Sequence, residues 1–351
     1  MALFKVNNIR IAGIAATVPK RIMSNLNYNF VSEEERKKII KLTGVEEKRI
    51  SAEGVTASDL CIKSAKKLMD DLGWKPEEID VLVFVSQSRD YIIPNTAHHI
   101  QAQLGLPKTC AAFDIPLGCS GYVYGLFAAA NTMAAGSIKK GLFLAGETPH
   151  FVVSERDKAS HPLFGDAGTA TALEFSNHAP TMYFNLQSDG SGLQSLYVPG
   201  GGTRLPLTEE NSVEEKISEG IYRSAKHLVI DGVKVFEFTM REVPDNATAL
   251  LTYANKNIDD IDWFVMHQAN LLMMETARKI LRIPVDKTPY SIRHFGNTSS
   301  ASIPLTIVTQ ISDNVSSGKS NWLLSGFGTG LSWGSCYIET GPVYCPPLIE
   351  Y

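Results

Sequence analysis

The residues I-D at 79–80 open a series of motifs: V-L-V-F-V at 81–85, L-G-L-P-K at 104–108, G-C-S-G at 118–121 and G-L-F-L-A-G at 141–146. A second series follows the same order: I-D at 261–262, W-F-V-M at 263–266, L-R-I-P at 281–284, G-N-T-S at 296–299 and N-W-L-L-S-G at 321–326. A sequence that repeats itself in this way indicates a duplicated structural unit. In each copy a polar residue directly follows a glycine at the predicted start of an apolar helix, Cys119 in the first copy and Asn297 in the second.

The size and composition of the chain fit two similar halves that share one core. The chain has 351 residues, of which 44% are hydrophobic, and this length corresponds to about two domains. We therefore predict an N-terminal half over 1–178 and a C-terminal half over 179–351, packed on each other. The net charge of −4 gives no basic surface for nucleic acid or anionic lipid. The acidic run over 209–219 is interpreted as a solvated excursion of the second half.

The apolar periodicity predicts an α/β fold in which strands and helices alternate. Strands are expected over 9–17, 81–86, 141–146 and 169–175, and again over 262–266, 321–325 and 333–339. Helices are expected over 33–41, 56–72, 95–104 and 120–137, and again over 232–256, 269–281 and 299–316.

The cysteines and histidines indicate neither a disulfide framework nor a metal site. The five cysteines include no C-x-x-C pair, and the eight histidines form no H-x-x-x-H pattern. We therefore expect a cytoplasmic protein without a metal. The N-terminus alternates like a strand and lacks the layout of a signal peptide. The uncharged segment 115–138 contains a helix that is barely long enough to span a bilayer, and we expect it to be buried in the protein core.

Cys119 is the candidate nucleophile. It lies in F-D-I-P-L-G-C-S-G-Y-V-Y-G-L at 113–126, which predicts a strand, a tight turn and a helix. The amides and the dipole at a helix N-terminus lower the pKa of a thiol, so we expect Cys119 to be largely thiolate at neutral pH. Cys61, Cys110 and Cys336 are interpreted as inert buried cysteines.

Two further motifs place polar groups at equivalent points of the second copy. D-W-F-V-M-H-Q-A-N at 262–270 ends a strand with His267, and G-N-T-S-S-A-S-I-P at 296–304 begins a helix with Asn297. The loop G-F-G-T-G at 326–330 is followed by a predicted strand and not by a helix, which argues against a dinucleotide site. A glycine loop between two strands can instead offer backbone N–H groups to an oxyanion.

These motifs, together with F-G-D-A-G-T-A at 164–170 and G-F-G-T-G-L-S-W-G-S at 326–335, resemble those of β-ketoacyl-acyl-carrier-protein synthase III, of the thiolase superfamily. The resemblance extends over nearly the whole chain. It implies a five-layered α-β-α-β-α thiolase fold made of two duplicated halves, a homodimer, and a Cys-His-Asn site. It also implies an acyltransferase that begins fatty acid biosynthesis or a related lipid pathway.

The resemblance implies a role for each motif residue. Cys119 would take an acyl group from acyl-CoA as a thioester, and its own N–H and that of Thr329 would form the oxyanion hole. His267 and Asn297 would act as neutral donors to the thioester carbonyl of a malonyl group while it loses CO₂. The malonyl group would be carried by acyl-carrier protein or by CoA. No cofactor is expected beyond these thioester substrates.

Other positions correspond to substrate contacts of the family. Thr43, Gly232 and Asn270 match positions along the pantetheine tunnel. Lys38 stands where typical members have a tryptophan against the CoA adenine, and Ile93 replaces the usual phenylalanine that gates the acyl pocket. Lys158 replaces an arginine ahead of Phe164.

The departures from the family concern recognition of the carrier and leave other activities open. Glu237 and Leu272 stand where typical members have basic residues for docking the acidic carrier protein. An acyltransferase that passes the acyl group of Cys119 to a hydroxyl or amine remains an alternative. A papain-like protease and a non-catalytic subunit of a ketosynthase pair are weaker alternatives, because the protease signature is absent and the Cys-His-Asn set is complete.

Overall fold

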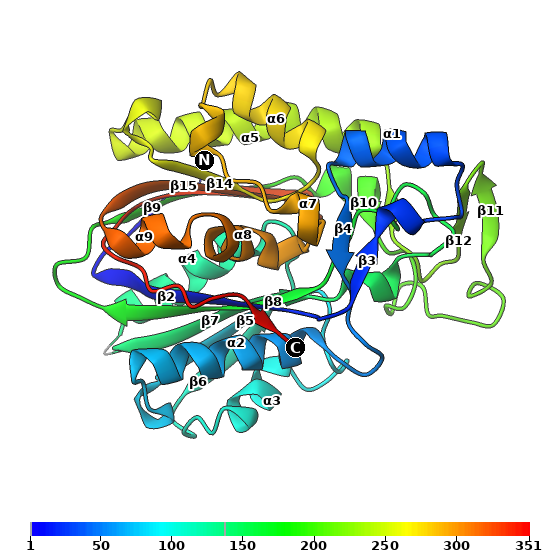
Figure 1. The fold of residues 1–351 in the computed structure, drawn as a ribbon. Helices are drawn as coiled ribbons and strands as arrows, with labels where there is room; N and C mark the ends of the chain where they lie inside the picture. Colours follow the sequence, from blue (N-terminus) through cyan, green and yellow to red (C-terminus); the bar gives the residue numbers. More distant parts are fainter. Residues whose placement is uncertain (1, 137) are drawn as a thin grey trace.

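Two β-sheets with helices between and outside them organise the chain (Figure 1). The computed structural model describes residues 2–136 and 138–351. The first sheet has the strand order β17 (Ile349–Glu350), β2 (Ile9–Val18), β8 (Ala167–Phe175), β7 (Lys140–Glu147), β5 (Val81–Val85) and β6 (Ala111–Ile115). The second sheet has the order β1 (Ala2–Val6), β9 (Met182–Ser188), β16 (Ser332–Thr340), β15 (Ser320–Gly328) and β14 (Trp263–Met266).

The helices form three layers around these sheets (Figure 1). The outer face of the first sheet is covered by α2 (Ala57–Leu72) and α3 (Thr96–Gln103). The layer between the sheets consists of α4 (Gly121–Ala134), α8 (Ser302–Gln310) and α9 (Ser312–Ser317). The outer face of the second sheet is covered by α5 (Gly232–Ala254), against which α6 (Leu271–Ile280) packs. The five layers are those of the predicted α-β-α-β-α fold.

The strand directions show the duplication directly. In the first sheet β5 is parallel to β7, β7 is antiparallel to β8, and β8 is antiparallel to β2. In the second sheet β14 is parallel to β15, β15 is antiparallel to β16, and β16 is antiparallel to β9. The predicted boundary after residue 178 falls between β8 and β9, where the chain passes between the sheets. Each chain end joins the sheet of the other half: the N-terminal strand β1 pairs with β9 of the second sheet, and the C-terminal strand β17 pairs with β2 of the first.

Most of the predicted elements are present, with three informative differences. The helix predicted over 299–316 is a 3₁₀ turn (Ser299–Ala301) followed by α8 and α9. The helix predicted over 120–137 corresponds to α4 and ends at Ala134, while residue 137 lies outside the described residues. Strand β9 was not predicted, whereas β6 is the strand expected ahead of the turn at Cys119.

Helix α4 lies between the two sheets and is buried along most of its length. It contacts β5 and β7 of the first sheet and β15 and β16 of the second. Its side chains belong to the central apolar cluster, which joins Val81 and Val83 to Trp322 and Leu324. In the part of the chain that the structure describes, no helix has the length and apolar character needed to cross a membrane.

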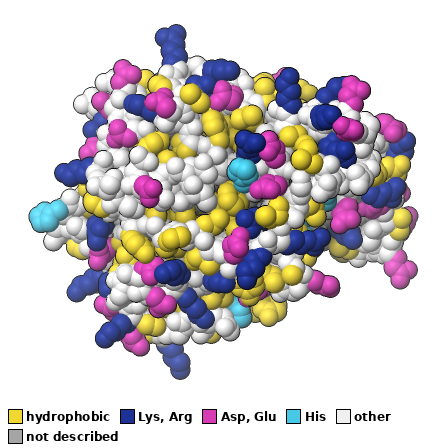
Figure 2. Space-filling model, in the orientation of Figure 1, with side chains coloured by type: hydrophobic (Ala, Val, Ile, Leu, Met, Phe, Trp, Pro, Cys, Tyr) yellow, Lys and Arg dark blue, Asp and Glu magenta, His cyan; other side chains and the backbone are white. Residues whose placement is uncertain are grey.

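Two long connections lie side by side at one end of the sheets (Figure 1). The first, over 19–56, contains β3 (Ile22–Ser24), α1 (Glu33–Thr43) and β4 (Glu47–Arg49). The second, over 189–231, contains β10 (Leu196–Tyr197), β11 (Glu215–Ser218), β12 (Ile221–Arg223) and β13 (Val229–Ile230). We call this second connection the excursion. Its acidic run is largely exposed, as predicted, and Figure 2 shows charges of both signs interspersed on this face of the molecule.

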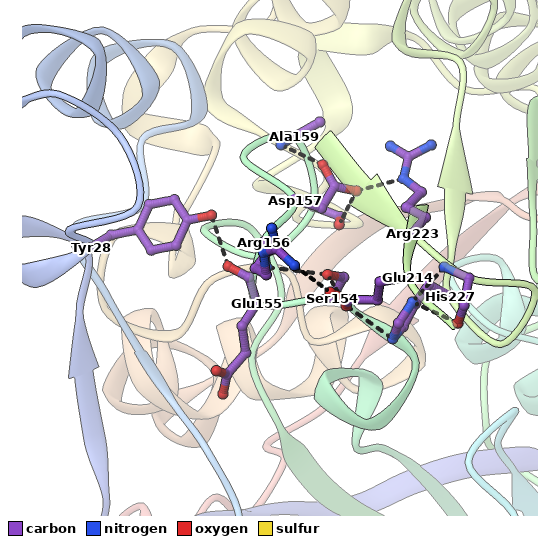
Figure 3. Close-up of polar contacts among 11 residues, drawn as sticks. Tyr28, Ser154, Glu155, Arg156, Asp157, Ala159, Glu214, Arg223 and His227 are labelled. Atoms are coloured by element: carbon purple, nitrogen blue, oxygen red, sulfur yellow. Dashed lines mark hydrogen bonds and ion pairs between the residues drawn. The ribbon is translucent and has the colours of Figure 1, made fainter. Parts of the chain in front are cut away.

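A polar network fastens the excursion to the segment between β7 and β8 (Figure 3). The Nε of Arg223 donates to the fully buried carboxylate of Asp157 at 2.7 Å. The hydroxyl of Ser154 donates to Glu214 at 2.6 Å, and the guanidinium of Arg156 lies 3.9 Å from the centre of the Tyr222 ring. Separating the excursion from this segment would leave the buried charge of Asp157 without its partner, which is costly, so the network stabilises their contact.

Candidate active site

Cys119 lies in the turn between β6 and α4 and is buried, with 7% of its surface exposed. The turn needs a glycine before the cysteine. A Cβ placed on Gly118 would lie 2.4 Å from Oε1 of Gln87 and 3.1 Å from the hydroxyl of Ser299. A side chain at position 118 would therefore displace the groups that surround the thiol.

The loop between β15 and β16 packs directly on Cys119. The two strands form an antiparallel hairpin, so the G-F-G-T-G loop joins two strands, as predicted. A Cβ placed on Gly328 would lie 2.6 Å from the Cβ of Cys119 and 3.1 Å from its sulfur. The glycines thus allow the loop to approach the thiol, and the backbone N–H groups of Cys119 and Thr329 both act on the sulfur. This arrangement suits the predicted oxyanion hole.

The expectation that Cys119 is largely thiolate is wrong for the unliganded protein. Burial raises the pKa of the Cys119 thiol to about 12, although the Ser299 hydroxyl and the N–H groups of Cys119 and Thr329 favour the thiolate. The reason is that removing a thiolate from water costs more than these neutral donors return. The resting group is therefore a thiol, and its proton must leave during the attack on a thioester.

His267 follows β14 and is neutral. Burial lowers the pKa of its imidazole to about 3. Its Nδ1 lies 2.8 Å from the hydroxyl of Ser302, and that hydroxyl donates its only proton to the carbonyl of Ser299 at 2.8 Å. The hydroxyl must then accept a hydrogen bond from an Nδ1–H group of His267. This network assigns the Nδ1–H tautomer and leaves Nε2 as a hydrogen-bond acceptor, whereas the sequence suggested a donor to the substrate.

Asn297 presents its amide nitrogen as the available donor. Its Oδ1 accepts the N–H of Ser299 at 2.9 Å, and its Nδ2 is 3.4 Å from the carbonyl of Ala269, which is a long contact. The backbone on either side of Phe164 also holds Asn297. The N–H of Asn297 donates to the carbonyl of Leu163 at 2.8 Å, and the N–H of Gly165 donates to the carbonyl of Asn297 at 3.1 Å. The Asn297 side chain is therefore oriented before any substrate binds.

One cavity of about 1340 Å³ contains these groups. The predicted residues that line it are Cys119, His267, Asn297, Thr329, Thr43, Lys158, Phe164, Gly232 and Asn270. Its further walls come from α1, α5, α6, the excursion and the segment between β7 and β8. The cavity is large enough for a thioester with an extended arm, since small-molecule sites occupy about 300–1,000 Å³.

Two predicted substrate residues lie outside this cavity. Lys38 forms an exposed ion pair with Glu34 at 2.6 Å, while Ile39, Leu42 and Thr43 of the same helix line the cavity. Successive helical residues point in different directions, so the position aligned with the family's tryptophan faces solvent here. Ile93 is 84% exposed and lies beyond the cavity wall.

Several residues of the site were not identified from the sequence. Ser299 and Ser302 lie in the quoted G-N-T-S-S-A-S-I-P motif, but nothing in the sequence indicates their contacts with the thiol and the imidazole. Glu147 directly follows the quoted strand motif G-L-F-L-A-G. It lines the cavity, and burial raises its pKa to about 7. Its place at the carboxyl end of a strand of a duplicated sheet was the available indication.

Comparisons with known proteins agree on one family. The family model described as 3-oxoacyl-[acyl-carrier-protein (ACP)] synthase III matches residues 113–190, and the model of its C-terminal part matches residues 251–340. The β-ketoacyl-[acyl-carrier-protein] synthase III of Syntrophomonas wolfei is 32% identical over 336 residues, which are 95% of this chain and 98% of that protein. Synthase III 2 of Halalkalibacterium halodurans is 33% identical, over 93% of this chain and 95% of that protein.

Solved structures give the same result. A 3-oxoacyl-(acyl-carrier protein) synthase from Burkholderia xenovorans LB400 is 36% identical, covers 99% of both chains and superposes with a TM-score of 0.93. The priming β-ketosynthase of the R1128 polyketide pathway is 26% identical, covers 97% of this chain and 98% of that chain, and has a TM-score of 0.81.

We predict that alkylation of Cys119 by iodoacetamide accelerates with pH. Because the pKa of the thiol is raised to about 12, the thiolate fraction should rise about tenfold for each pH unit between about pH 6 and pH 9. Intact-protein mass would follow the reaction, with Cys119→Ala as the control. An alkylation rate that no longer rises with pH above neutrality would contradict this prediction, because it would show that the helix terminus lowers the pKa of Cys119 by more than burial raises it.

We further predict that Gly328→Ala removes the reactivity of Cys119 towards thioesters. The new Cβ would overlap the Cys119 side chain and push the Thr329 N–H out of position, and losing one such donor costs about 10²–10³ in rate. The matched control is Gly341→Ala, where an added Cβ meets nothing within 4 Å. Equal acylation rates in the two variants would contradict the role given to the glycine loop.

Proposed function

Because this chain belongs to the β-ketoacyl-acyl-carrier-protein synthase III family of condensing enzymes, we propose that Cys119 carries the acyl group in its reaction. The observation that carries the proposal is one cavity shared by a buried thiol, two N–H groups directed at it, an acceptor imidazole and a donor amide. The alternative of acyl transfer to a hydroxyl or amine without condensation is not favoured by these relatives.

The first step transfers the acyl group from CoA to Cys119. The thiol attacks the thioester carbonyl while Nε2 of His267 takes its proton, and the developing oxyanion lies between the N–H groups of Cys119 and Thr329. When the carbon–sulfur bond to CoA breaks, the same proton passes from His267 to the CoA thiolate. The step leaves acyl-Cys119, free CoA and neutral His267.

The second step joins this acyl group to a malonyl thioester. Nδ2 of Asn297 donates to the malonyl thioester carbonyl while CO₂ leaves, and the resulting enolate attacks the carbonyl carbon of acyl-Cys119. The Cys119 thiolate departs and takes up one proton from solvent through His267. The products are CO₂ and a β-ketoacyl thioester. No electron transfer occurs, and we propose that the reaction needs no cofactor beyond its thioester substrates.

We also propose a homodimer. Strand β6 ends the first sheet with one unpaired edge, and such edges are normally covered in native proteins. Beside it the loop after β5 exposes Tyr91, Ile92 and Ile93, the last two at 78% and 84%. A second copy placed on this edge would cover them.

We expect light scattering to give the mass of two chains for the protein in solution. Replacing Ile92 and Ile93 together by lysine should yield single chains, because the charges would remain buried without partners. The control variant is Ile280→Lys, because Ile280 is a 49% exposed isoleucine on α6, away from this edge. A wild-type mass of one chain, or an unaffected double variant, would contradict this interface.

The two steps should respond differently to two substitutions. Asn297→Ala is expected to keep most single-turnover acylation of Cys119 but to lose malonyl decarboxylation by a factor on the order of 10². His267→Ala is expected to slow both steps, because its Nε2 is the proton acceptor of the first. Intact mass follows the first step and CO₂ release the second. If His267→Ala were acylated as fast as the wild type, His267 would not be the proton acceptor of the first step and would act in the second step alone.

The surface that would meet a carrier protein is weakly basic. Glu237 is exposed, Leu272 is 45% exposed, and Arg278 is already paired with Glu275 at 2.7 Å. An acidic carrier would therefore gain little electrostatic attraction here. We propose that the malonyl donor is carried by CoA or by a specialised carrier that docks differently.

The corresponding experiment adds the missing charges. Glu237→Lys combined with Leu272→Arg should raise the condensation rate with malonyl on the ordinary fatty-acid carrier by about tenfold, and added salt should remove the gain. The rate with malonyl-CoA should not change, which makes it the internal control. A wild-type protein that already prefers the ordinary carrier, with an advantage that falls with salt, would overturn the proposal.

A further inference from the structure

Glu147 is a buried carboxyl group that the two steps above do not use. It is the last residue of β7, is 2% exposed, and lines the cavity that contains Cys119. Among the residues that the structure describes, it forms no ion pair with a lysine, arginine or histidine. Burying a carboxylate without a cation costs free energy unless hydrogen bonds satisfy it. The partners of Glu147 therefore indicate what the side chain does.

Those partners belong to the loop that follows β5. Oε1 of Glu147 accepts the backbone N–H of Gln87 at 3.0 Å, and Oε2 accepts the hydroxyl of Ser88 at 2.7 Å. The Ser88 hydroxyl accepts in turn the N–H of Thr148 at 3.0 Å. The carboxyl group thus holds together two neighbouring parallel strands beyond their last paired residues, Val85 and Ala145.

Gln87 connects this carboxyl group to the nucleophile. Its side chain packs on the turn before Cys119, because a Cβ on Gly118 would lie 2.4 Å from Oε1 of Gln87. The same Oε1 lies 3.4 Å from the hydroxyl of Thr329, on the glycine loop. The amide of Gln87 therefore touches both segments whose N–H groups act on the Cys119 sulfur.

We propose that Glu147 is a positioning residue that holds Gln87, through its backbone, against the two halves of the oxyanion hole. The inference rests on the proposed role of Cys119 as the acyl carrier. Without the carboxyl group, the N–H of Gln87 and the hydroxyl of Ser88 lose their buried acceptor, and the Gln87 amide is free to leave the gap between Gly118 and Thr329. The carbonyl of the bound thioester would then be held less accurately.

This role predicts an effect on the rate of acyl transfer and not on the binding of acyl-CoA. A displacement of about 1 Å at reacting atoms can cost 10²-fold in rate. The residues that line the cavity near α1, α5 and α6 lie on other elements. Substitutions of Glu147 should therefore leave the half-saturating concentration of acyl-CoA nearly unchanged.

A double-mutant cycle tests whether Glu147 acts through Gln87. We would measure single-turnover acylation of Cys119 by intact mass in the wild type, Glu147→Ala, Gln87→Ala and the double variant. Each single variant should be slower by about tenfold or more, and the double variant should be no slower than the slower single variant. Glu147→Gln, which keeps an oxygen acceptor for the N–H of Gln87, should recover most of the rate.

Asp80→Ala is the matched control. Asp80 also accepts a backbone N–H across β5 and β7, from Lys139 at 2.9 Å, but at the opposite ends of these strands. It should lower stability without changing the acylation rate. If Glu147→Ala does not fold, Ser88→Ala replaces it in the cycle, because this change removes the shortest hydrogen bond of the carboxyl group, at 2.7 Å, and leaves the carboxyl group in place.

Two results would overturn the inference. The first is that Glu147→Ala slows acylation by the same factor in the wild type and in the Gln87→Ala variant, since Glu147 would then act independently of Gln87. The second is a normal acylation rate in Glu147→Ala with a lowered melting temperature, which is the result for a purely structural carboxyl group. Failure of the proposed function itself would be seen differently, as a wild-type protein that no acyl-CoA acylates at Cys119.

Discussion

The close contact between the glycine loop and Cys119 is the constraint on which the site depends. Gly328 leaves no room for a side chain beside the thiol, so the N–H of Thr329 can reach the sulfur. The loop belongs to the hairpin of β15 and β16, while Cys119 belongs to the turn between β6 and α4. The thiol site therefore exists only where the two duplicated halves meet.

Burial determines the protonation of the groups gathered there. It raises the pKa of Cys119 to about 12 and lowers that of His267 to about 3. The thiol and the acceptor imidazole in this cavity are both neutral, so no thiolate is present in advance, and the proton leaves the thiol while the thioester is attacked. The N–H groups at the start of the helix after Cys119 position the sulfur but do not make it a thiolate. Their effect on the pKa is smaller than that of removing the sulfur from water.

The repeated motifs predicted two similar α/β halves, and the resemblance to a known family supplied the five-layered arrangement; the strand order of the sheets was not predicted. Cys119, His267 and Asn297 were identifiable because each follows a strand or a glycine in a repeated pattern. The tautomer of His267 was not, since it depends on a contact with Ser302, the first residue of α8. Lys38 was misplaced because alignment gives a position along a helix but not the direction of its side chain, and Glu147 was missed because its partners lie in the loop after β5, far away in the sequence.

The role of Cys119 and of the glycine loop can be tested with a crystal structure of the protein acylated at Cys119. We expect the thioester carbonyl oxygen to lie about 2.7–3.1 Å from the backbone nitrogens of both Cys119 and Thr329, with Nδ2 of Asn297 free on the cavity side for the second thioester. A carbonyl oxygen turned away from both nitrogens, or an acyl group on another cysteine, would contradict these roles.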